Sequence, residues 1–541
     1  MTFRTHDVTN QPPPLEGHNP FLLDAALREA LAREGAEWAE ADLTALGELA
    51  GTPEAIEWGR LANENPPELQ THDRFGYRRD EVEYHPAYHH LMETAVGHGM
   101  HATPWAEDRP GAHVARAAKM IVWSSVDAGH TCPISMTYSV VAALQHAPEL
   151  LNRWLPGLAS LRYDPTFGPA GRKTGLTAGM AMTEKQGGSD VRANTTVAEP
   201  DGDGAYRLTG HKWFVSAPMS DVFLALAQAP EGLSCYLLPR WMPDGSRNAF
   251  FIQRLKDKLG DRSNASSEVE LDGAWALPVG DPGRGVRTII EMVNRTRLDC
   301  SLGAAAGMRH GLAQAIHHAR HRDAFGKRLS DQPLMEQVLA DLALEAEAAT
   351  AAALRLAGAY DREVHDETEA AFARIATPVV KYWNTKRAAA HAAEAMECLG
   401  GNGYVEESPL PRLYRQATVN GIWEGSGNVI CLDVLRAMHR APEATEVFLD
   451  ELRLAAGVDR RYDTALERLE KALVDDVSEA GARRLVERMA VTLQASLLLR
   501  HAPRAVADGF VAARLPRPRA AYGTLPVGVD AGAIVLRALP A

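Results

Sequence analysis

Two glycine-rich stretches in the C-terminal half carry the residue types best suited to acid–base chemistry. They read Leu399-Gly-Gly-Asn-Gly-Tyr404 and Ile422-Trp-Glu-Gly-Ser-Gly-Asn428. Glu424 follows an aromatic residue and precedes a flexible turn, so its carboxylate could be buried against a flat cofactor with its pKa raised by burial. The pattern therefore predicts a carboxylate base, whose partner must be sought in the rest of the chain.

Three further polar segments could contact the same ligand. Met182–Val191 contains two adjacent glycines that allow close backbone approach, with hydroxyl and amide side chains around them. Trp213–Ser216 combines aromatic residues with a hydroxyl, and Arg322–Gly326 places a cation beside a tight turn, which suits a phosphate. Alternatively, Met182–Val191 is only a loop that enters a sheet, and the residue types in Trp213–Ser216 reflect ordinary sheet packing.

Several other kinds of site are excluded or disfavoured by their missing signatures. No G-x-G-x-x-G follows a predicted strand, which argues against a nicotinamide site, and Gly425-Ser426-Gly427 lacks the G-x-S-x-G elbow of serine hydrolases. There is no H-E-x-x-H and no Cys/His pairing with zinc-ligand spacing. His317, His318 and His321 lie close together in a predicted helix, where a polar face explains them better than a metal, so no metal site is predicted.

Composition limits the compartment and the partners. The chain has 541 residues, a net charge of −13 and five cysteines without paired spacing, which favours reduced thiols in the cytoplasm. The first residues lack the apolar core of a leader peptide, and no apolar run reaches the roughly 20 residues of a membrane span. Charge is uneven, because the segment from Glu446 onward carries a net charge of +1 while the rest carries −14.

Hydrophobic patterning predicts an α+β protein of four domains. Residues 1–178 and 284–441 read as helical, the latter as a four-helix bundle, and residues 179–283 read as a small β-barrel or sandwich. Residues 442–541 form an extra C-terminal helical domain. The predicted helices are Leu22–Trp38, Ala115–Val126, Thr137–Leu151, Thr288–His321, Gln332–Tyr360, Glu367–Leu399 and Val429–His439. The predicted strands are Tyr206–Ser216, Val222–Ala227, Leu233–Leu238, Phe250–Arg254 and Ser267–Leu271, after an extended arm at Gln11–Leu15.

In this order the polar segments resemble the acyl-CoA dehydrogenase flavoprotein superfamily over about residues 80–440. The resemblance is carried by Met182–Val191, Lys212–Ser216, Lys258–Arg262, Arg322–Gly326, Leu399–Tyr404 and Trp423–Asn428. The chain is closer still to the AidB-type alkylation-response flavoproteins. That closer likeness is carried by Met182–Asp190, Leu255–Gly260, Arg262–Ser266, Ile422–Asn428 and Cys431–Arg436, together with the extra C-terminal domain.

The resemblance implies FAD as the cofactor and a homotetramer as the assembly. By analogy Met182–Val191 wraps the isoalloxazine ring, Phe214 covers it and Ser216 places a hydroxyl on flavin N5. Ser426 lies near the pyrophosphate, and Arg322, Phe325 and the Gly400–Gly401 turn hold the adenosine end across a subunit interface. The implied cofactor residues are Met182, Thr183, Glu184, Lys185, Gln186, Gly187, Gly188, Ser189, Asp190, Val191, Phe214, Ser216, Ala217, Pro218, Arg322, Phe325, Gly400, Gly401, Trp423, Gly425, Ser426, Gly427, Asn428 and Asp433.

The same resemblance assigns Glu424 to the base position of many family members. Desaturation of an acyl thioester requires removal of an α-proton and transfer of a β-hydride to flavin N5. The other base position known in the family falls near Thr296, where no glutamate stands. Glu397, Asn428 and Pro333 replace frequent family glutamines, and no CoA-specific set is evident, so at most modest, isovaleryl-CoA-like dehydrogenase activity is expected. Alternatively, Glu424 only closes the pocket.

Arginines in the C-terminal domain predict a second activity. If Glu446–Leu473 is one helix, several arginines share one face of it, which is the electrostatic footprint of phosphate-backbone binding. A solvated helix with internal ion pairs is the alternative. The AidB resemblance favours sequence-independent binding of double-stranded DNA. The implied DNA contacts are Arg436, Arg453, Arg460, Arg461, Arg468, Arg483, Arg484 and Arg488.

Three functions therefore remain in view. The leading one is an FAD flavoprotein that binds DNA in the adaptive response to alkylation damage, with weak acyl-CoA dehydrogenase activity. The second is a metabolic acyl-CoA dehydrogenase whose tail serves only assembly. The third is a flavin oxidase or monooxygenase that acts on nitroalkanes or alkylating agents.

Overall fold

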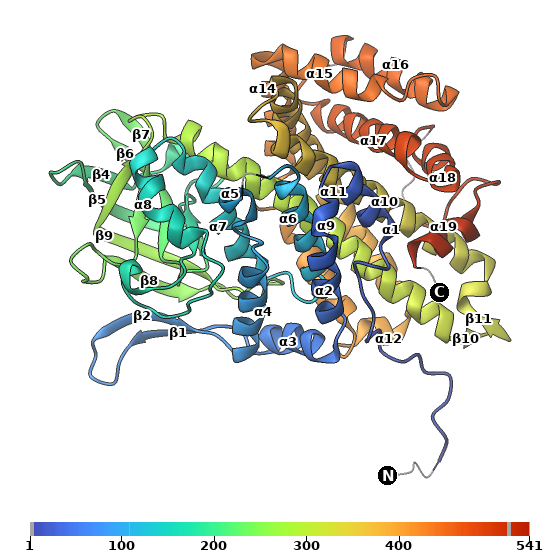
Figure 1. Ribbon diagram of the computed structural model, residues 1–541, viewed down its shortest axis with the longest axis horizontal. Coiled ribbons are helices and arrows are strands. Elements are labelled where there is room, and N and C mark those ends of the chain that lie inside the picture. Colours follow the sequence, from blue (N-terminus) through green and yellow to red (C-terminus); the bar gives the residue numbers. More distant parts are fainter. Residues whose placement is uncertain (1–4, 108, 476, 517–520, 540–541) are drawn as a thin grey trace. The chain divides into compact units, whose positions relative to one another are not determined.

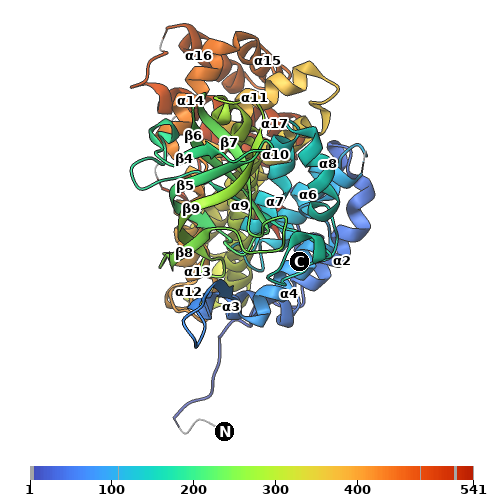
Figure 2. The same cartoon turned by 90° about the vertical axis from the view of Figure 1, so that its left-hand side faces the viewer.

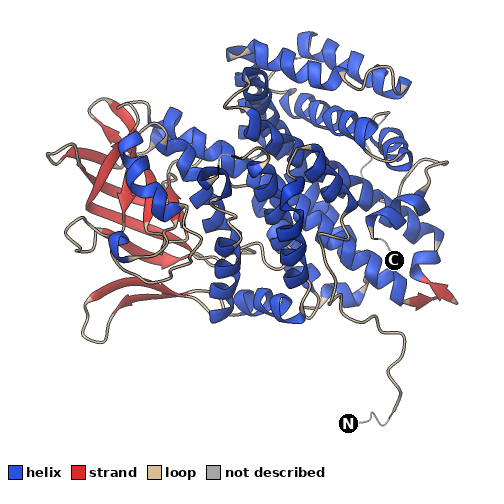
Figure 3. Ribbon diagram, viewed as in Figure 1, coloured by secondary structure: helices blue, strands red, loops and turns tan. Residues whose placement is uncertain are grey.

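The chain divides into two compact units. The computed structural model describes residues 5–107, 109–475, 477–516 and 521–539. Unit 1 consists of residues 1–53 and 300–541, and unit 2 consists of residues 54–299. Figure 1 labels the elements, and Figure 3 colours the strands red. The strands belong to unit 2, apart from a short hairpin in unit 1. The four predicted domain boundaries remain predictions.

Unit 2 combines helices with a closed sheet. Its helices are α3 Pro53–Glu64, α4 Pro86–Gly97, α5 Thr103–Ala106, α6 Ala112–Trp123, α7 Thr131–Leu144 and α8 Pro148–Leu158. Its strands are β1 Glu68–His72, β2 Arg78–Glu83, β3 Ala178–Ala181, β4 Val197–Pro200, β5 Tyr206–Ser216, β6 Val222–Ala229, β7 Gly232–Pro239, β8 Phe250–Leu255 and β9 Ser266–Val279. β1 and β2 form a separate hairpin.

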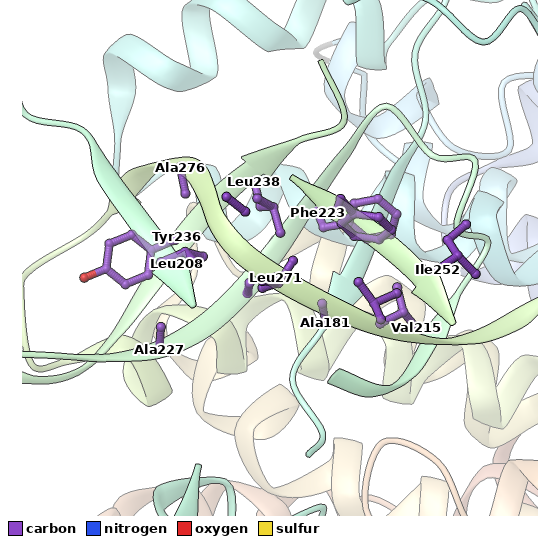
Figure 4. Close-up of a cluster of buried hydrophobic side chains, with 14 of the residues drawn as sticks. Ala181, Leu208, Val215, Phe223, Ala227, Tyr236, Leu238, Ile252, Leu271 and Ala276 are labelled. Atoms are coloured by element: carbon purple, nitrogen blue, oxygen red, sulfur yellow. The ribbon is translucent and has the colours of Figure 1, made fainter. Parts of the chain in front are cut away.

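The sheet of β3–β9 closes on itself. Its strand order is β3-β6-β4-β5-β9-β7, β8 pairs with β9, and β7 returns to pair with β6, so the ladder forms a ring. The small β domain, predicted as a barrel or a sandwich, is therefore a barrel. Figure 4 shows part of its filling, in which Phe223 comes from β6, Tyr236 and Leu238 from β7 and Leu271 from β9, and each is nearly or fully buried. The ring is formed by β4, β5, β6, β7 and β9, while β3 and β8 each pair with one strand of it.

A bulge interrupts β5 at the residues predicted to face the cofactor. Lys212 pairs with Val269 and Val215 pairs with Ser267, so Trp213 and Phe214 together oppose the single residue between those partners on β9. An extra residue in one strand increases the local twist and redirects the side chains. Phe214 is 52% exposed, although Lys212 and Val215 on either side of the bulge pair normally.

Unit 1 is built around long helices. They are α1 Ala25–Arg33, α2 Glu40–Ala50, α9 Gly285–His321, α10 Pro333–Arg362, α11 Glu367–Glu397, α12 Gly401–Tyr404, α13 Pro409–Ala417 and α14 Gly427–Arg440, of which α9 begins before residue 300. A two-residue hairpin, β10 Asp323–Ala324 and β11 Lys327–Arg328, follows α9. α11 packs against α10, α13 and α14, which supplies the predicted helical bundle.

The C-terminal segment is packed onto that bundle. It contains α15 Pro442–Arg453, α16 Arg460–Asp475, α17 Ala482–His501, α18 Arg504–Arg514 and α19 Ala531–Ala538. α17 packs against both α10 and α11, as the two views in Figures 1 and 2 also show. Buried ion pairs join the two parts, because Arg514 of α18 contacts Asp341 at 2.6 Å and Glu345 at 3.0 Å on α10.

Most predicted elements are present, and the errors have local causes. The five predicted strands are confirmed, although β9 continues to Val279. The predicted helix Leu22–Trp38 is too long, because α1 ends at Arg33 and Gly35 adopts a φ of +84°. The single helix Thr137–Leu151 is wrong, since α7 ends at Leu144 and α8 begins at Pro148, whose ring disfavours a helical preceding residue.

The described residues add two general properties. All five cysteines are free, and burial raises the thiol pKa of Cys235 and Cys398 to about 12 and that of Cys431 to about 11. Among the helices that the structure describes, none is both long and apolar enough to cross a membrane.

Candidate functional site

Glu424 lies in a tight turn between the short helix Val419–Gly421 and α14. Its φ is +57°, in the left-handed region that non-glycine residues rarely adopt, and Gly425 follows with a φ of +103°. Ser426 then occupies the N-cap of α14. The Trp423 indole donates to the Asn420 side chain at 3.1 Å, which fixes the start of the turn. The glutamate side chain is half-buried, less than the burial expected from the sequence.

A buried lysine holds this turn. The Lys381 ammonium, on α11, donates to the carbonyl oxygens of Trp423 at 3.0 Å and Gly425 at 2.7 Å. Lys381 is 1% exposed, so its charge is compensated by these and other contacts within the protein. The carbonyls on both sides of Glu424 are thereby fixed, which supports the unfavourable backbone conformation between them.

The first turn of α14 is positively charged. A Cβ atom added to Gly427 would lie 2.8 Å from Lys386 Cε and 3.3 Å from a terminal guanidinium nitrogen of Arg483. The same Arg483, on α17, donates from Nε to the Asn428 amide oxygen at 2.8 Å. Two cations beside a helix N-terminus suit a diphosphate group. Arg483 was predicted to contact DNA, whereas in the structure it bonds the start of this helix.

The elements assigned to the adenosine end also lie in unit 1. The β10–β11 hairpin turns at Phe325 and Gly326, both with positive φ, and the Phe325 ring is 98% exposed. Gly400 begins the second element with a φ of +60° just before α12. The Arg322 guanidinium donates to the backbone carbonyl of Asn10 in the N-terminal arm.

In unit 2 the structure brings the Met182–Val191 loop and β5 together. The Glu184 carboxylate is buried and accepts from Lys212 Nζ at 2.8 Å, from the Thr195 amide at 2.7 Å and from the Thr196 hydroxyl at 2.6 Å. Trp213 donates its amide to the Thr183 carbonyl at 2.8 Å. Burial by itself raises the pKa of Glu184, but Lys212 and these hydrogen bonds outweigh it and lower the pKa to about 2. Glu184 therefore fixes the loop from inside.

The remaining loop residues face outward beside an aromatic and a hydroxyl group. Lys185, Gln186, Gly188, Ser189 and Asp190 are exposed. On β5, next to the bulge, the Ser216 hydroxyl lies 3.1 Å from that of Ser266.

Ala217, Pro218 and Lys256 determine the shape of the chain around Ser216. Ala217 has a φ of +47°, and Pro218 accepts from the buried Arg240. The Lys256 ammonium lies 3.2 Å from the centre of the Trp213 ring, which steadies the bulge. An exposed aromatic ring, a hydroxyl and a glycine loop on one barrel edge fit a flat heteroaromatic ligand.

Asp433 is less accessible than the other residues assigned to the cofactor. It is buried on α14 and pairs with Arg374 at 3.2 Å, so it helps to attach α14 to α11.

The three histidines near the end of α9, His317, His318 and His321, are not part of a metal-ligand cluster within the described part of the chain. His317 contacts the Pro13 carbonyl at 2.9 Å, and no group of three metal-ligating side chains occurs among the residues that the structure describes.

The predicted basic helix is wrong as a single element. α15 ends at Arg453 and α16 begins at Arg460, because Gly457 has a φ of +81° and Asp459 bonds the amide of Arg461. Two of the arginines are neutralised. Arg453 pairs with Glu446, Asp450 and Glu470, and Arg461 pairs with Asp459 and Asp508.

Other arginines of the set remain on the surface. Arg460 and Arg468 are exposed on α16, Arg484 and Arg488 are exposed on α17, and Arg436 is exposed on α14. Arg460 and Arg468 fall within about 80° of each other around α16 at 100° per residue, so they share a face.

Three functional contacts were not predicted from the sequence. Lys381 and Lys212 are single lysines within apolar segments, and Asn10 lies in a proline-rich arm. A lysine in an apolar segment is a signal of a buried charge that requires a partner, and this signal was available for both lysines. Nothing in the local pattern around Asn10 indicates its contact with Arg322.

Comparisons with known proteins fit this architecture. The family model "Adaptive response protein AidB N-terminal domain" matches residues 10–165, and the middle and C-terminal domain models of acyl-CoA dehydrogenases match residues 179–274 and 283–439. AidB of Escherichia coli (strain K12) is 50% identical over 89% of this chain and 89% of its own length. The chain belongs to the AidB branch of the acyl-CoA dehydrogenase family. The predicted family is thus confirmed.

Two solved structures share this fold along more than nine-tenths of the chain. The complex of Caenorhabditis elegans ACDH-11 with C11-CoA is 28% identical, with a TM-score of 0.84 over 94% of this chain and 92% of that one. The apo form of Bd2924 is 30% identical, with a TM-score of 0.83 over 91% of this chain and 99% of that one. The predicted acyl-CoA dehydrogenase fold with added helical regions is confirmed by this coverage.

Acyl-CoA dehydrogenase family members depend on FAD, so the predicted cofactor is confirmed at the level of the family. The residues present fit such a group. Phe214 and Ser216 with their loop suit the ring system, and the cationic start of α14 suits the diphosphate. The first set belongs to unit 2 and the second to unit 1.

Proposed function

We propose that the protein is an FAD-dependent acyl-CoA dehydrogenase-type enzyme in which Glu424 removes the α-proton of an acyl thioester. The turn fixed by Lys381 is the observation that carries this proposal. A left-handed backbone at a glutamate is unfavourable, and such strain concentrates at functional sites. Closing a pocket would not by itself require the carboxylate-bearing residue to be held on both sides.

The chain's own residues would divide the work of desaturation. Glu424 takes the proton from the α-carbon, which leaves an electron pair to form the double bond as a hydride departs from the β-carbon. Bound flavin supplies the acceptor for that hydride. Ser216 and the exposed loop residues beside Phe214 would bind the flavin ring, and Ser426, Lys386 and α14 would bind its diphosphate.

An acyl thioester is favoured as the substrate class by one relative. ACDH-11, which shares this fold along 94% of the chain, has been solved with C11-CoA. We propose that this protein also accepts an acyl-CoA. The replacement of family glutamines by Glu397, Asn428 and Pro333 supports a turnover below that of metabolic relatives.

Anaerobic reduction of the bound flavin tests the role of Glu424. Glu424→Gln should slow bleaching of the visible flavin band by a panel of acyl-CoAs by at least about 100-fold, since a positioned base contributes about 10²–10⁴-fold. Glu407→Gln, an exposed glutamate nearby in the chain, should leave the rate unchanged. Equal rates in both variants would remove Glu424 from the reaction.

We further propose that the protein binds double-stranded DNA in the adaptive response to alkylation damage. The exposed arginines Arg460, Arg468 and Arg488 support this proposal, because cations on the protein surface can release counterions from a duplex. Few aromatic residues lie between these arginines, which favours contacts to phosphates over contacts to bases. Binding should therefore show no sequence preference. Arg453 and Arg461 contribute less, since carboxylates surround them.

Assembly and compartment complete the proposal. Large apolar side chains are exposed in unit 1, among them Phe325, Leu334, Tyr404 and Ile422. Such residues mark surfaces that a second copy covers, which agrees with the expected homotetramer. Sedimentation of the FAD-loaded protein should give the tetramer mass. Five free thiols favour a reducing compartment such as the cytoplasm.

A further inference from the structure

The N-terminal arm, defined here as residues 5–20, contacts both elements assigned to the adenosine end of FAD. The Asn10 side chain donates to the Asp323 carbonyl at 2.8 Å and accepts from the Asp323 amide at 2.7 Å. Its own backbone carbonyl accepts from the Arg322 guanidinium. The next residue, Gln11, accepts from the Asn402 side chain at 3.1 Å. Two consecutive arm residues therefore connect the β10–β11 hairpin to α12, next to the Gly400–Gly401 turn.

The arm is anchored well enough to hold these contacts. Asn10 has a φ of +56°, a left-handed conformation that asparagine tolerates better than most residues, and it directs its side chain and carbonyl to adjacent positions of the hairpin. Further along the arm, the Pro13 carbonyl contacts His317 at 2.9 Å, and the Gly17 amide donates to the Gly51 carbonyl at 2.7 Å.

The surface beside these contacts is open. Cβ atoms added to Gly326, Gly400 or Gly401 would meet nothing within 4 Å, and Phe325 is almost fully exposed. Asn10 engages one end of the Arg322 guanidinium, which has five N–H donors in a fixed plane. Holding one donor fixes the direction of the others, and those suit a phosphate.

We propose that Asn10 and Gln11 are positioning residues for the adenosine diphosphate half of FAD. They fix Arg322 and bring the Gly400–Gly401 turn into register with it, before the cofactor binds. Preorganisation of this kind raises affinity by reducing the ordering that binding requires. The inference rests on the proposed flavin site, because Arg322 must contact FAD for the arm to matter.

A comparison of FAD with FMN tests this proposal, since FMN lacks the adenosine half. The variant Asn10→Gly with Gln11→Ala removes both side chains, and glycine tolerates the left-handed backbone. Apoprotein of the variant should bind FAD about tenfold more weakly than the wild type, and the holoenzyme should release FAD faster on dilution. The Kd for FMN and the shape of the bound flavin's visible spectrum should not change. Asp7→Ala, an exposed substitution on the same arm, should behave as wild type.

The outcomes separate this inference from the proposed function. An unchanged Kd for FAD, or an equal loss for FAD and FMN, would overturn the positioning role. Arg322→Ala provides the reference. If it weakens FAD while the arm variant does not, only the inference about the arm fails. If Arg322→Ala leaves FAD binding intact, both the assignment of Arg322 and the role of the arm fail.

Discussion

Lys381 holds the backbone of Glu424 from both sides. Its ammonium binds the carbonyls of the preceding and following residues at 3.0 and 2.7 Å, although 43 positions separate the two residues in the chain. Lys381 lies among buried residues of α11, so the position of the ammonium is determined by packing. The conformation of the proposed base therefore depends on a helix that is separated from it in the chain by α12, α13 and the short helix Val419–Gly421.

Replacement of Lys381 by methionine should separate the shape of the turn from its charge. Lys381→Met keeps the apolar stem but leaves two carbonyls without their charged donor, which should lower the free energy of unfolding by about 3 kcal/mol. Glu424 should lose its fixed orientation, so flavin bleaching by an acyl-CoA should slow by more than the loss of folded protein explains. Scanning calorimetry and single-turnover kinetics measure the two effects.

Lys471→Met is the matched control, because Lys471 is an exposed lysine on α16. It should change neither quantity. A destabilised Lys381→Met protein that bleaches at the wild-type rate would show that the lysine serves folding alone.

The Glu184 contacts should make stability depend on acid pH. The folded-state pKa of about 2 lies below the ordinary value of 4.5, so the ionised carboxylate stabilises the fold above about pH 4.5. That contribution, about 3 kcal/mol for a shift of this size, should be lost as pH falls from about 5 towards 2. Thermal unfolding of wild type and Glu184→Gln across this range measures it.

The two proteins should differ most near neutral pH and converge on acidification. At neutral pH the variant also leaves Lys212 buried without its carboxylate, which adds to the loss. A constant difference between the two proteins down to pH 2.5 would contradict the lowered pKa.

The sequence predicts features that depend on residues close together in the chain, and it does not predict contacts between residues far apart in the chain. Strands such as β5 were predicted because alternation and turn residues are local signals, and the family strings located the Met182–Val191 loop. The break at Gly457 was missed because the helical pattern continues on both sides of it. Pairs such as Lys381 with the Glu424 turn join distant residues, and a single sequence carries no record of which distant residues meet.

The ion pairs of the C-terminal helices predict which arginines should matter for DNA. Arg468→Ala removes an exposed cation of α16 and should reduce the slope of log K against log salt by about 0.9, one phosphate contact. Arg453→Ala should leave the slope unchanged, because three carboxylates already neutralise that guanidinium. Fluorescence titration of a labelled duplex at several salt concentrations distinguishes them, and equal slopes in all three proteins would place the DNA face elsewhere.

Arg514 shows why the C-terminal segment should be probed by single substitutions rather than by truncation. Its guanidinium bonds Asp341 and Glu345, both buried on α10, and Arg387 also contacts Glu345 at 3.1 Å. Burial by itself raises the pKa of Glu345, but Arg514 and Arg387 outweigh it and lower the pKa. Removal of one partner leaves buried charge without compensation, so Arg514→Met should destabilise the protein by about 3–5 kcal/mol.

Adding Asp341→Asn to Arg514→Met should recover part of that loss, because one uncompensated carboxylate is then neutral. A double-mutant cycle from chemical unfolding measures the coupling between the two residues, and strictly additive losses would contradict it.

A protein cut after Ala441 loses Arg514 and all of α17 at once, which exposes faces of α10 and α11 that are now covered. We expect it to aggregate. Loss of DNA binding in such a protein would therefore reflect misfolding, whereas Arg468→Ala keeps these contacts intact.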